Sequence, residues 1–479
     1  MSDPSLKVTA KQGGLPVNDP ERVKALHREL VETGVQYCFA TYVDVHGVPK
    51  AKAVPIASFE KMCAGSELFT VGAMDGMGLI GPEKDECAAV PDLDSCTIFP
   101  WDKRYAWFAS DLWYHDSPYK NCSRVILKKA LAKTKEAGFG MNLGVETEFY
   151  VLRATEDGTA PLAERPHKGP CPAYDVHQTV QSMSYLERIV EAMNTLGWNV
   201  YSFDAEGGQS QYELDFAYAD VLTMCDRLVF FRFMAKTLAQ QMGLVASFMP
   251  KPFAGDFRSG AHFNMSLYDQ ASGENLFAGN GGDLAAKHGI PFPDLGYHFV
   301  SGILDHASAI TAVTCPSFNS YKGLLAQGEM ADMSWAPVLR AYGKNNRSAM
   351  IRLPMNRPCV ENRAPDISCN FHLGAAITLM AGLEGIEKSG DPGDPMNDNL
   401  YLRLGKPTAS DTFETETGTV RRLPRTLLEA LQAFETDPIA VETFGEEMRD
   451  IYLGWKLSEW ERDYYRVEEP ERQRLLEAI

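Results

Sequence analysis

The segment 144–152, Gly-Val-Glu-Thr-Glu-Phe-Tyr-Val-Leu, constrains the fold of this chain more than any other feature. Its aromatic and β-branched residues predict a strand, and residues two apart on a strand point to the same face. Glu146 and Glu148 therefore share one face, and Val145 and Phe149 share the apolar one. Two adjacent carboxylates repel each other and are not buried without a cation. The pair indicates either a site for a hard divalent ion such as Mg²⁺ or Mn²⁺ or an ordinary solvated surface.

The composition of the chain is that of a globular protein and excludes several function classes. Its 479 residues are 45% hydrophobic and 23% charged, which allows two or three domains with a large core. The net charge of −18, without a local basic patch, predicts that the chain binds no nucleic acid. We find no signal peptide pattern, no apolar run long enough for a membrane and no C-x-x-C pair among the ten cysteines. We therefore expect a cytoplasmic protein with free thiols and no membrane partner.

The order of helices and strands predicts an α+β fold with a mainly antiparallel sheet, because the two do not alternate in regular βαβ units. Residues 1–18 are polar, and we expect a flexible N-terminus there. A helix begins at Asp19-Pro20 and ends at Gly34, and strands at 37–43 and 50–54 follow it. Further helices are predicted over residues 123–137, 180–196, 220–242, 297–313, 371–387, 425–434 and 441–465.

A glycine-rich segment, Gly-Ala-Met-Asp-Gly-Met-Gly, spans residues 72–78. So many glycines make the segment too flexible to belong to a core. It suits a loop that closes over a ligand, although an ordinary surface loop explains it equally well.

Three further segments place polar side chains on one face of a predicted strand, backed by apolar residues. A lone histidine on a strand more often has a structural role than a ligand role, so each segment is a weak signal by itself. Together with Glu146 and Glu148 they predict a funnel with a polar inner face. The segments are 206–213, in which Gln211 and Glu213 share a face, 259–267, in which His262, Asn264 and Ser266 share a face, and 361–366, which begins Glu-Asn-Arg.

A cationic group lies between the last two of these segments in the sequence. It consists of Arg347 and Arg352, which stand five residues apart, just before Leu353-Pro354. Arginine is suited to bind the oxygens of a phosphoryl group in transfer. The alternative is a pair of surface salt bridges. The neighbouring polar segments favour the phosphate site.

Taken in order, these motifs resemble the glutamine synthetase superfamily over residues 20–465. The resemblance implies a small N-terminal β-grasp domain over residues 19–112 and a large catalytic domain over 113–479, with a curved antiparallel sheet and flanking helices. It also implies a homo-oligomeric ring, such as a dodecamer, in which a neighbour's N-terminal domain completes each active site. The matching motifs are Val-Glu-Thr-Glu-Phe (145–149), Phe-Met-Pro-Lys-Pro-Phe (248–253), Ser-Gly-Ala-His-Phe-Asn-Met-Ser (259–266), Asn-Ser-Tyr-Lys (319–322), Asn-Arg-Ser (346–348) and Leu-Met-Ala-Gly-Leu-Glu-Gly-Ile (379–386).

The resemblance also implies roles for individual residues. In the family, ATP phosphorylates a side-chain carboxylate, and an amine then attacks the acyl phosphate to give an amide; two Mg²⁺ or Mn²⁺ ions and arginines neutralise the moving phosphoryl group. The implied metal ligands are Glu148, Glu206 and Glu213 for the ion facing the acceptor carboxylate, and Glu146, His262 and Glu361 for the ion facing the nucleotide. The implied nucleotide contacts are Tyr218, Asn264, Ser266, Arg347 and Arg352. The implied catalytic residues are Arg347 and Arg363 at the phosphate, and Asp75 and Glu329 as acceptors of the amine's proton.

Several positions depart from the family pattern. Gly323 replaces an arginine that holds the α-carboxylate of the amino acid, and Phe257-Arg258 replaces an Asn-Gly pair in the glutamate-binding loop. We consider Arg258 a candidate replacement for the lost cation. Cys359 replaces an arginine before Glu361, with Arg357 close by, and the tyrosine of the ammonium pocket falls in a local deletion near residues 168–170.

The family's Asp-Gly-Ser-Ser of the ammonium pocket is matched at best by Asp75-Gly76-Met77-Gly78. With the missing tyrosine, this change removes polar groups from the ammonium pocket and adds apolar ones. These departures predict a γ-glutamyl amide ligase that uses a small alkyl or aromatic amine, such as methylamine, isopropylamine or aniline. The alternatives are an ordinary glutamine synthetase that uses ammonium and an inactive, glutamine synthetase-like binding protein; a guanidine phosphotransferase ranks last. Tyr401 resembles a tyrosine that some bacterial members adenylylate, but we prefer a structural role for it.

Overall fold

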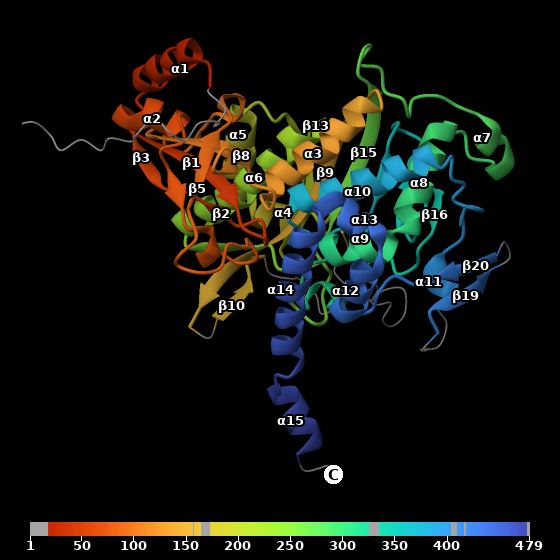
Figure 1. Ribbon diagram of the computed structural model, residues 1–479. Coiled ribbons are helices and arrows are strands. Elements are labelled where there is room, and N and C mark those ends of the chain that lie inside the picture. The colour runs from red at the N-terminus through yellow and green to blue at the C-terminus, as the bar shows by residue number, and fades with distance from the viewer. Residues whose placement is uncertain are drawn as a thin grey trace, which may run out of the picture.

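Two β-sheets organise the computed structural model, which describes residues 18–156, 158–163, 173–324, 335–403, 410–415 and 418–476 (Figure 1). The N-terminal sheet contains β1 (Tyr37–Val43), β2 (Pro49–Lys50), β3 (Ala53–Pro55), β4 (Leu68–Phe69), β5 (Cys87–Pro91), β6 (Thr97–Ile98), β7 (Tyr105–Tyr114) and β8 (Ser117–Pro118). Its main path is β2-β1-β7-β5-β4, in which β1 and β7 run parallel. Helices α1 (Pro20–Thr33) and α2 (Phe59–Cys63) bury Leu30 and Met62 in the same core as this sheet.

The second sheet has ten strands and carries the polar motifs. It contains β9 (Phe139–Thr155), β10 (Gly158–Pro161), β11 (Val200–Ala205), β12 (Gln211–Phe216), β13 (Ala219–Asp220), β14 (Leu244–Ser247), β15 (Ala261–Asp269), β16 (Tyr342–Lys344), β17 (Ile351–Leu353) and β18 (Val360–Asn362). The main path is β11-β12-β9-β15-β18-β17-β16, and all pairings between its described strands except β16 with β17 are antiparallel. The α+β class and the antiparallel sheet predicted from the sequence are confirmed.

Helices flank the second sheet, and Figure 1 shows α14 and α15 extending away from the body of the molecule. A small hairpin of β19 (Thr412–Thr415) and β20 (Gly418–Arg421) lies apart from both sheets. The helices are α3 (Ser123–Glu136), α4 (Val176–Gln181), α5 (Met183–Thr195), α6 (Val221–Gln241), α7 (Asp283–His288), α8 (Asp294–Asp305), α9 (Ala307–Thr314), α10 (Phe371–Glu387), α11 (Leu400–Arg403), α12 (Leu427–Thr436), α13 (Pro438–Phe444), α14 (Glu446–Tyr464) and α15 (Glu469–Leu475).

Strand β9 has one apolar and one acidic face, as its sequence predicts. Val145, Phe149 and Val151 are buried in the main core. The ring of Phe149 lies 5.8 Å from that of Phe231 on α6, in an edge-to-face arrangement. Apolar contacts on this side fix the register of β9, and they therefore fix which way Glu146 and its neighbours point.

A buried ion-pair cluster joins the N-terminal sheet to helices α3 and α6. Arg124 on α3 is only 4% exposed and pairs with three carboxylates. Its Nη2 lies 2.7 Å from Asp92 and 3.0 Å from Asp226 on α6, and its Nη1 lies 2.8 Å from Asp111 on β7. Removing one member of such a cluster leaves buried charge unpaired and is strongly destabilising. The cluster therefore connects the N-terminal sheet to helices α3 and α6, which pack against β9. The domain boundaries predicted at residues 18 and 112 stay a prediction.

The sequence predicts three segments as single helices, and this prediction is wrong because each is interrupted in the structure. The helix predicted over 180–196 is two helices that meet at Ser182, whose hydroxyl bonds the hydroxyl of Tyr212. The helix predicted over 297–313 breaks at His306, whose ring bonds Asp437 and Glu384. The helix over 441–465 breaks at Gly445, which has a φ of +74° that favours glycine. Contacts from distant segments cause the first two breaks.

The expectation that the segment 72–78 is too flexible for a core is also wrong. Met77 is fully buried in the N-terminal core, and its carbonyl accepts a hydrogen bond from the hydroxyl of Tyr119. Gly76 has a φ of +61° and lies against the side chain of Val45. The glycines therefore allow a tightly packed turn.

Two smaller expectations concern thiols and membranes. The nine described cysteines are all free thiols. Among the described helices, none combines the length and the hydropathy that crossing a membrane requires.

Candidate active site

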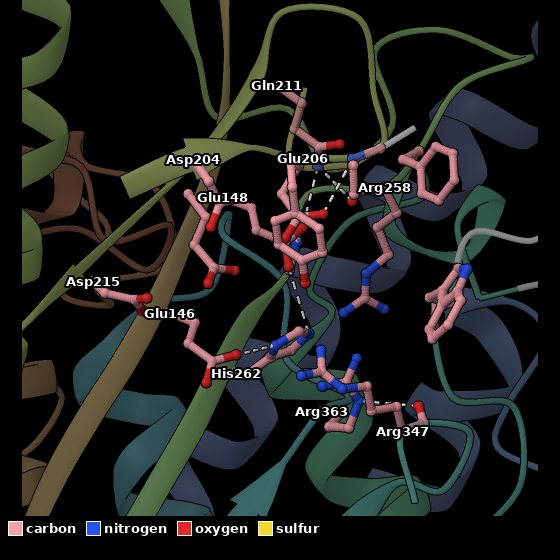
Figure 2. Close-up of a pocket in the computed structure, with 18 of the residues that line it drawn as sticks. Glu146, Glu148, Asp204, Glu206, Gln211, Asp215, Arg258, His262, Arg347 and Arg363 are labelled. Atoms are coloured by element: carbon pink, nitrogen blue, oxygen red, sulfur yellow. Dashed lines mark hydrogen bonds and ion pairs between the residues drawn. The ribbon is translucent and has the colours of Figure 1, made fainter. Parts of the chain in front are cut away.

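Acidic residues of three neighbouring strands and a histidine of a fourth converge on one cavity of about 560 Å³ (Figure 2). Strand register brings them together: His262 lies opposite Glu146, and Glu213 lies opposite both Glu148 and Asp204. The predicted polar funnel is therefore a single cavity. Its acidic wall is formed by Glu146, Glu148, Asp204, Glu206, Glu213 and Asp215, with His262 and Gln211 among them.

The imidazole of His262 lies between two of the glutamates. Its Nδ1 is 2.7 Å from Glu146 Oε2, and its Nε2 is 3.6 Å from Glu148 Oε1. Burial opposes the ionisation of Glu146, but the hydrogen bond and charge of His262, together with Arg363 and Arg357, hold the pKa of this carboxyl well below its ordinary value. Glu146 is therefore an ionised ligand ready for a cation.

Glu148 is held by the backbone of a glycine. The N–H of Gly260 donates to Glu148 Oε2 at 2.8 Å, and the side chain of Gln211 donates to the same oxygen at 3.2 Å. A Cβ atom on Gly260 would lie 2.9 Å from His262 Nε2 and 3.0 Å from Glu148 Oε1. Glycine is required here because the backbone passes directly under both ligands.

Glu206 and Glu213 lack a compensating charge, in contrast to Glu146. Burial and the neighbouring carboxylates raise the pKa of Glu206 to about 8 and the pKa of Glu213 well above its ordinary value. The same two causes raise the pKa values of Asp204 and Asp215 to about 6. Within the described part of the chain, no lysine or arginine forms an ion pair with these four groups. Full ionisation of Glu206 and Glu213 at neutral pH therefore requires a bound cation.

Three arginines surround Glu361, which is fully buried on β18. Arg363 Nη1 lies 2.6 Å from Glu361 Oε1, and Arg352 Nη1 and Arg357 Nη2 lie 2.7 and 3.2 Å from Oε2. Burial disfavours the charged carboxyl, but these arginines lower the pKa of Glu361 below its ordinary value. Arg357 also bonds Glu146 at 3.0 Å. The cavity thus has an arginine-rich end and an acid-rich end.

Two groups of side chains have the donors and the spacing to hold a metal ion. The ligand atoms of Glu146, His262 and Glu361 all lie within 4.8 Å of one another, and so do those of Glu148, Glu213 and His262. Carboxylate oxygens with a single imidazole suit hard divalent ions. The first group coincides with a predicted set. In the second, His262 stands where the prediction had Glu206, which lines the same cavity.

The residues predicted to contact the nucleotide extend from this cavity along the sheet. Arg347 and Arg352 line the cavity itself, as does Arg363. Asn264 donates to Glu146 Oε1 at 3.2 Å from the next position on β15. Tyr218 is 68% exposed, and Ser266, opposite Asn142, is buried further along β15. A Cβ atom on Gly144 would lie 3.4 Å from Tyr218 Cβ and 3.7 Å from Asn264 Cβ, so these two side chains border one surface.

The two predicted acceptors of the amine's proton have different outcomes. Asp75 does not line the cavity; its carboxylate lies 3.5 Å from His46 Nε2 at the N-terminal sheet, and its side chain is 53% exposed. Glu329 lies outside the described residues. Tyr401 is buried, and its hydroxyl donates to the carbonyl of Ala336 at 3.0 Å, which supports a structural role.

Sequence reasoning missed several residues that line the cavity. Arg357, noted only as a neighbour of Cys359, contacts both Glu146 and Glu361; its position four residues before Glu361 was the available signal. Four aromatic residues also line the wall: Tyr174, Tyr201, Phe257 and Trp335. Of these only Phe257 stood out in the sequence, as a departure from the motif.

Comparisons with known proteins agree on one family. The model of the glutamine synthetase catalytic domain matches residues 120–475. The glutamate–methylamine ligase of Methyloversatilis universalis is 36% identical over 431 residues, which cover 90% of this chain and 94% of the relative. The glutamine synthetase of Rhizobium meliloti is 34% identical over 429 residues, with the same two coverages. A solved GmaS/ADP complex superposes with a TM-score of 0.84 at 30% identity, covering 95% of this chain and 99% of the other.

The raised pKa of Glu206 gives a sharp test of metal binding. In Glu206→Gln the neutral amide resembles the protonated carboxyl, so we expect the metal-free protein to melt at or above the wild-type Tm. We expect Mn²⁺ to raise the Tm of the wild type, since an ion bound only to the folded state stabilises it by about 2.7 kcal/mol at 100 times its Kd. The rise should be much smaller in the variant.

Thermal denaturation with Mn²⁺ or with EDTA measures both effects. Glu274→Gln, at an exposed position far from the cavity wall, is the matched control and should keep the full rise. An unchanged rise in Glu206→Gln would contradict a metal role for this residue.

Proposed function

The chain belongs to the glutamine synthetase family, and from that premise we propose that it joins the γ-carboxylate of glutamate to a small alkyl or aromatic amine. Members of this family are ATP-dependent ligases that form carbon–nitrogen bonds, and this chain is such an enzyme. The observation that carries the finer proposal is the ring of Phe257. A Cβ atom on Gly207 would lie 2.7 Å from that ring, so the ring lies on the backbone next to Glu206 and gives the cavity an apolar wall there.

The acidic wall supports a role in binding divalent ions. Glu146, His262 and Glu361 would hold one ion, and Glu148, Glu206 and Glu213 would hold a second. Bound Mg²⁺ or Mn²⁺ would supply Lewis-acid polarisation and neutralise charge on the phosphoryl oxygens.

The arginines of the cavity would position the phosphates. Arg352 and Arg363 are oriented by Glu361, and the backbone carbonyl of Arg347 accepts a hydrogen bond from Arg363 Nε at 3.1 Å. With ATP bound, these guanidinium groups would neutralise charge on the γ-phosphoryl group as it passes to an oxygen of the γ-carboxylate. The products of this step are γ-glutamyl phosphate and ADP.

The amine then attacks the carbonyl carbon of the acyl phosphate, and phosphate leaves. The attacking nitrogen gives up a proton, for which Asp75 and Glu329 are the proposed acceptors. Asp75 lies away from the cavity of its own chain and is half exposed, which supports delivery from a neighbouring subunit in a homo-oligomeric ring such as a dodecamer.

The apolar wall distinguishes this proposal from ordinary glutamine synthetase. Ammonium needs several hydrogen-bond acceptors around it, whereas a substituted amine needs an apolar surface for its carbon atoms. Phe257 stands where the family has asparagine, and three further aromatic residues line the cavity. The similarity to a relative named glutamate–methylamine ligase supports the same conclusion.

An amine panel tests the proposal directly. With glutamate, ATP and Mg²⁺ or Mn²⁺, we expect phosphate release with methylamine, isopropylamine or aniline to exceed that with ammonium by at least about tenfold in kcat/KM, which corresponds to roughly 1.4 kcal/mol. A wide preference for ammonium would identify an ordinary glutamine synthetase. No turnover with any amine, in a protein that Mn²⁺ still stabilises, would identify a binding protein.

The role of Phe257 has its own test. In Phe257→Asn the wall becomes polar, so we expect the preference for the best amine over ammonium to fall by about tenfold, the lower end of what a methyl group contributes in an apolar pocket. The measurement is the ratio of the two kcat/KM values. Phe257→Leu keeps an apolar wall and should keep most of the preference. Equal ratios in both variants would show that this ring does not select the amine.

A further inference from the structure

Arg258 is a buried arginine in the wall of the cavity, and the mechanism above does not use it. It is 4% exposed and stands just before β15. Its Nη2 donates to the backbone carbonyls of Ala364 at 2.6 Å and Pro365 at 2.7 Å. Figure 2 shows its guanidinium directed into the cavity, toward the side where Arg347 and Arg363 lie. The two backbone contacts fix this orientation.

Gly323 provides the space for this side chain. A Cβ atom on Gly323 would lie 2.7 Å from Arg258 Cδ and 2.8 Å from its Cβ and Cγ. Any larger residue at 323 would displace the aliphatic part of Arg258. The two departures noted in the sequence are therefore one exchange, in which glycine replaces a side chain and an arginine from another loop fills the same space.

Arg258 forms no close ion pair with a described carboxylate, although the buried Asp366 lies near enough to interact with its charge. Arg352, Arg357 and Arg363 each pair with Glu361, but no described carboxylate forms an ion pair with Arg258, not even the nearby Asp366. Its Nη1 also lacks a hydrogen-bond partner in the structure. Burying a guanidinium without a close carboxylate partner is costly even where two carbonyls accept from it, so an anion in the cavity would relieve that cost.

The location of Arg258 indicates which anion this is. Gln211 Nε2 donates both to the carbonyl of Arg258 at 2.8 Å and to Glu148 Oε2 at 3.2 Å. The backbone of Arg258 therefore adjoins the Glu148 end of the cavity, where the acceptor carboxylate is proposed to react, and its guanidinium extends from there toward Arg347 and Arg363. Arg352 and Arg363 pair with Glu361, whereas Arg258 does not. An acid substrate with one carboxylate at Glu148 would extend its other end along Arg258, so we assign the anion beside Arg258 to the acid substrate.

We propose that Arg258 binds a second carboxylate of the acid substrate, the one that does not react, and so restricts the substrate to amino dicarboxylic acids such as glutamate. This inference rests on the proposed function, because it assigns a specificity residue to the same reaction. One carboxylate accepts the phosphoryl group, and Arg258 recognises the α-carboxylate at the other end.

The test compares glutamate with 4-aminobutyrate, which lacks only the α-carboxylate. We expect the wild type to prefer glutamate strongly. In Arg258→Met, which keeps the aliphatic part over Gly323, kcat/KM for glutamate should fall by at least about 30-fold more than for 4-aminobutyrate, as expected when a buried charge partner is lost. The loss should appear mainly in the KM for glutamate, while the KM for ATP changes little. Arg258→Lys, which keeps the charge, should recover part of the preference.

A second neutral variant separates the loss of charge from a loss of folding. The amide of Arg258→Gln can still donate to the carbonyls of Ala364 and Pro365, and a melting curve shows whether each variant is folded. If either folded neutral variant keeps the wild-type preference for glutamate, or loses activity equally with both acids, the inference is wrong. If the wild type itself shows no turnover with glutamate and any amine, the proposed function fails instead.

Discussion

Repulsion among carboxylates on neighbouring strands is the constraint on which the rest of this structure depends. Alternation along β9, β11 and β12 places five acids on one wall, and Glu206 follows directly after β11. The register of the strands prevents these acids from separating. His262 and the arginines around Glu361 compensate for one part of this charge. Glu206 and Glu213 form no ion pair with a cationic side chain of the described residues, and their pKa values are raised. Bound metal ions would stabilise their ionised forms.

The fold supplies what this acidic wall requires. The apolar face of β9, with Phe149 against Phe231, holds the strand in register. Gly260 lets the backbone pass under Glu148 and donate to it. At the other end of the cavity Glu361 orients three guanidinium groups. As a result, one end of the cavity is lined by carboxyl groups and the other by arginines. This distribution of charge suits the transfer of a phosphoryl group between a nucleotide and a carboxylate.

The sequence predicts features that depend on local periodicity, and it fails where distant contacts decide. The acidic face of β9 follows from a two-residue repeat, and α10 spans the predicted residues 371–387 because its apolar run is continuous. The break at His306 depends on a partner 131 residues away, Asp437. The proximity of Phe257 to Gly207 and of Arg258 to Gly323 likewise needs coordinates. The roles implied for Asp75 and Glu329 stay predictions, because Asp75 lies outside the cavity of its own chain and Glu329 lies outside the described residues.

The central claim is that the acidic wall binds paired divalent ions, and calorimetric titration of the metal-free protein with Mn²⁺ tests it most directly. Because the pKa of Glu206 lies near 8 without metal, this carboxyl holds a proton at pH 7 that an ion must displace. The account predicts two bound ions per chain, and a binding heat that varies with the ionisation enthalpy of the buffer as protons are released. Saturation at fewer than two ions, or a heat that is the same in every buffer, would contradict it.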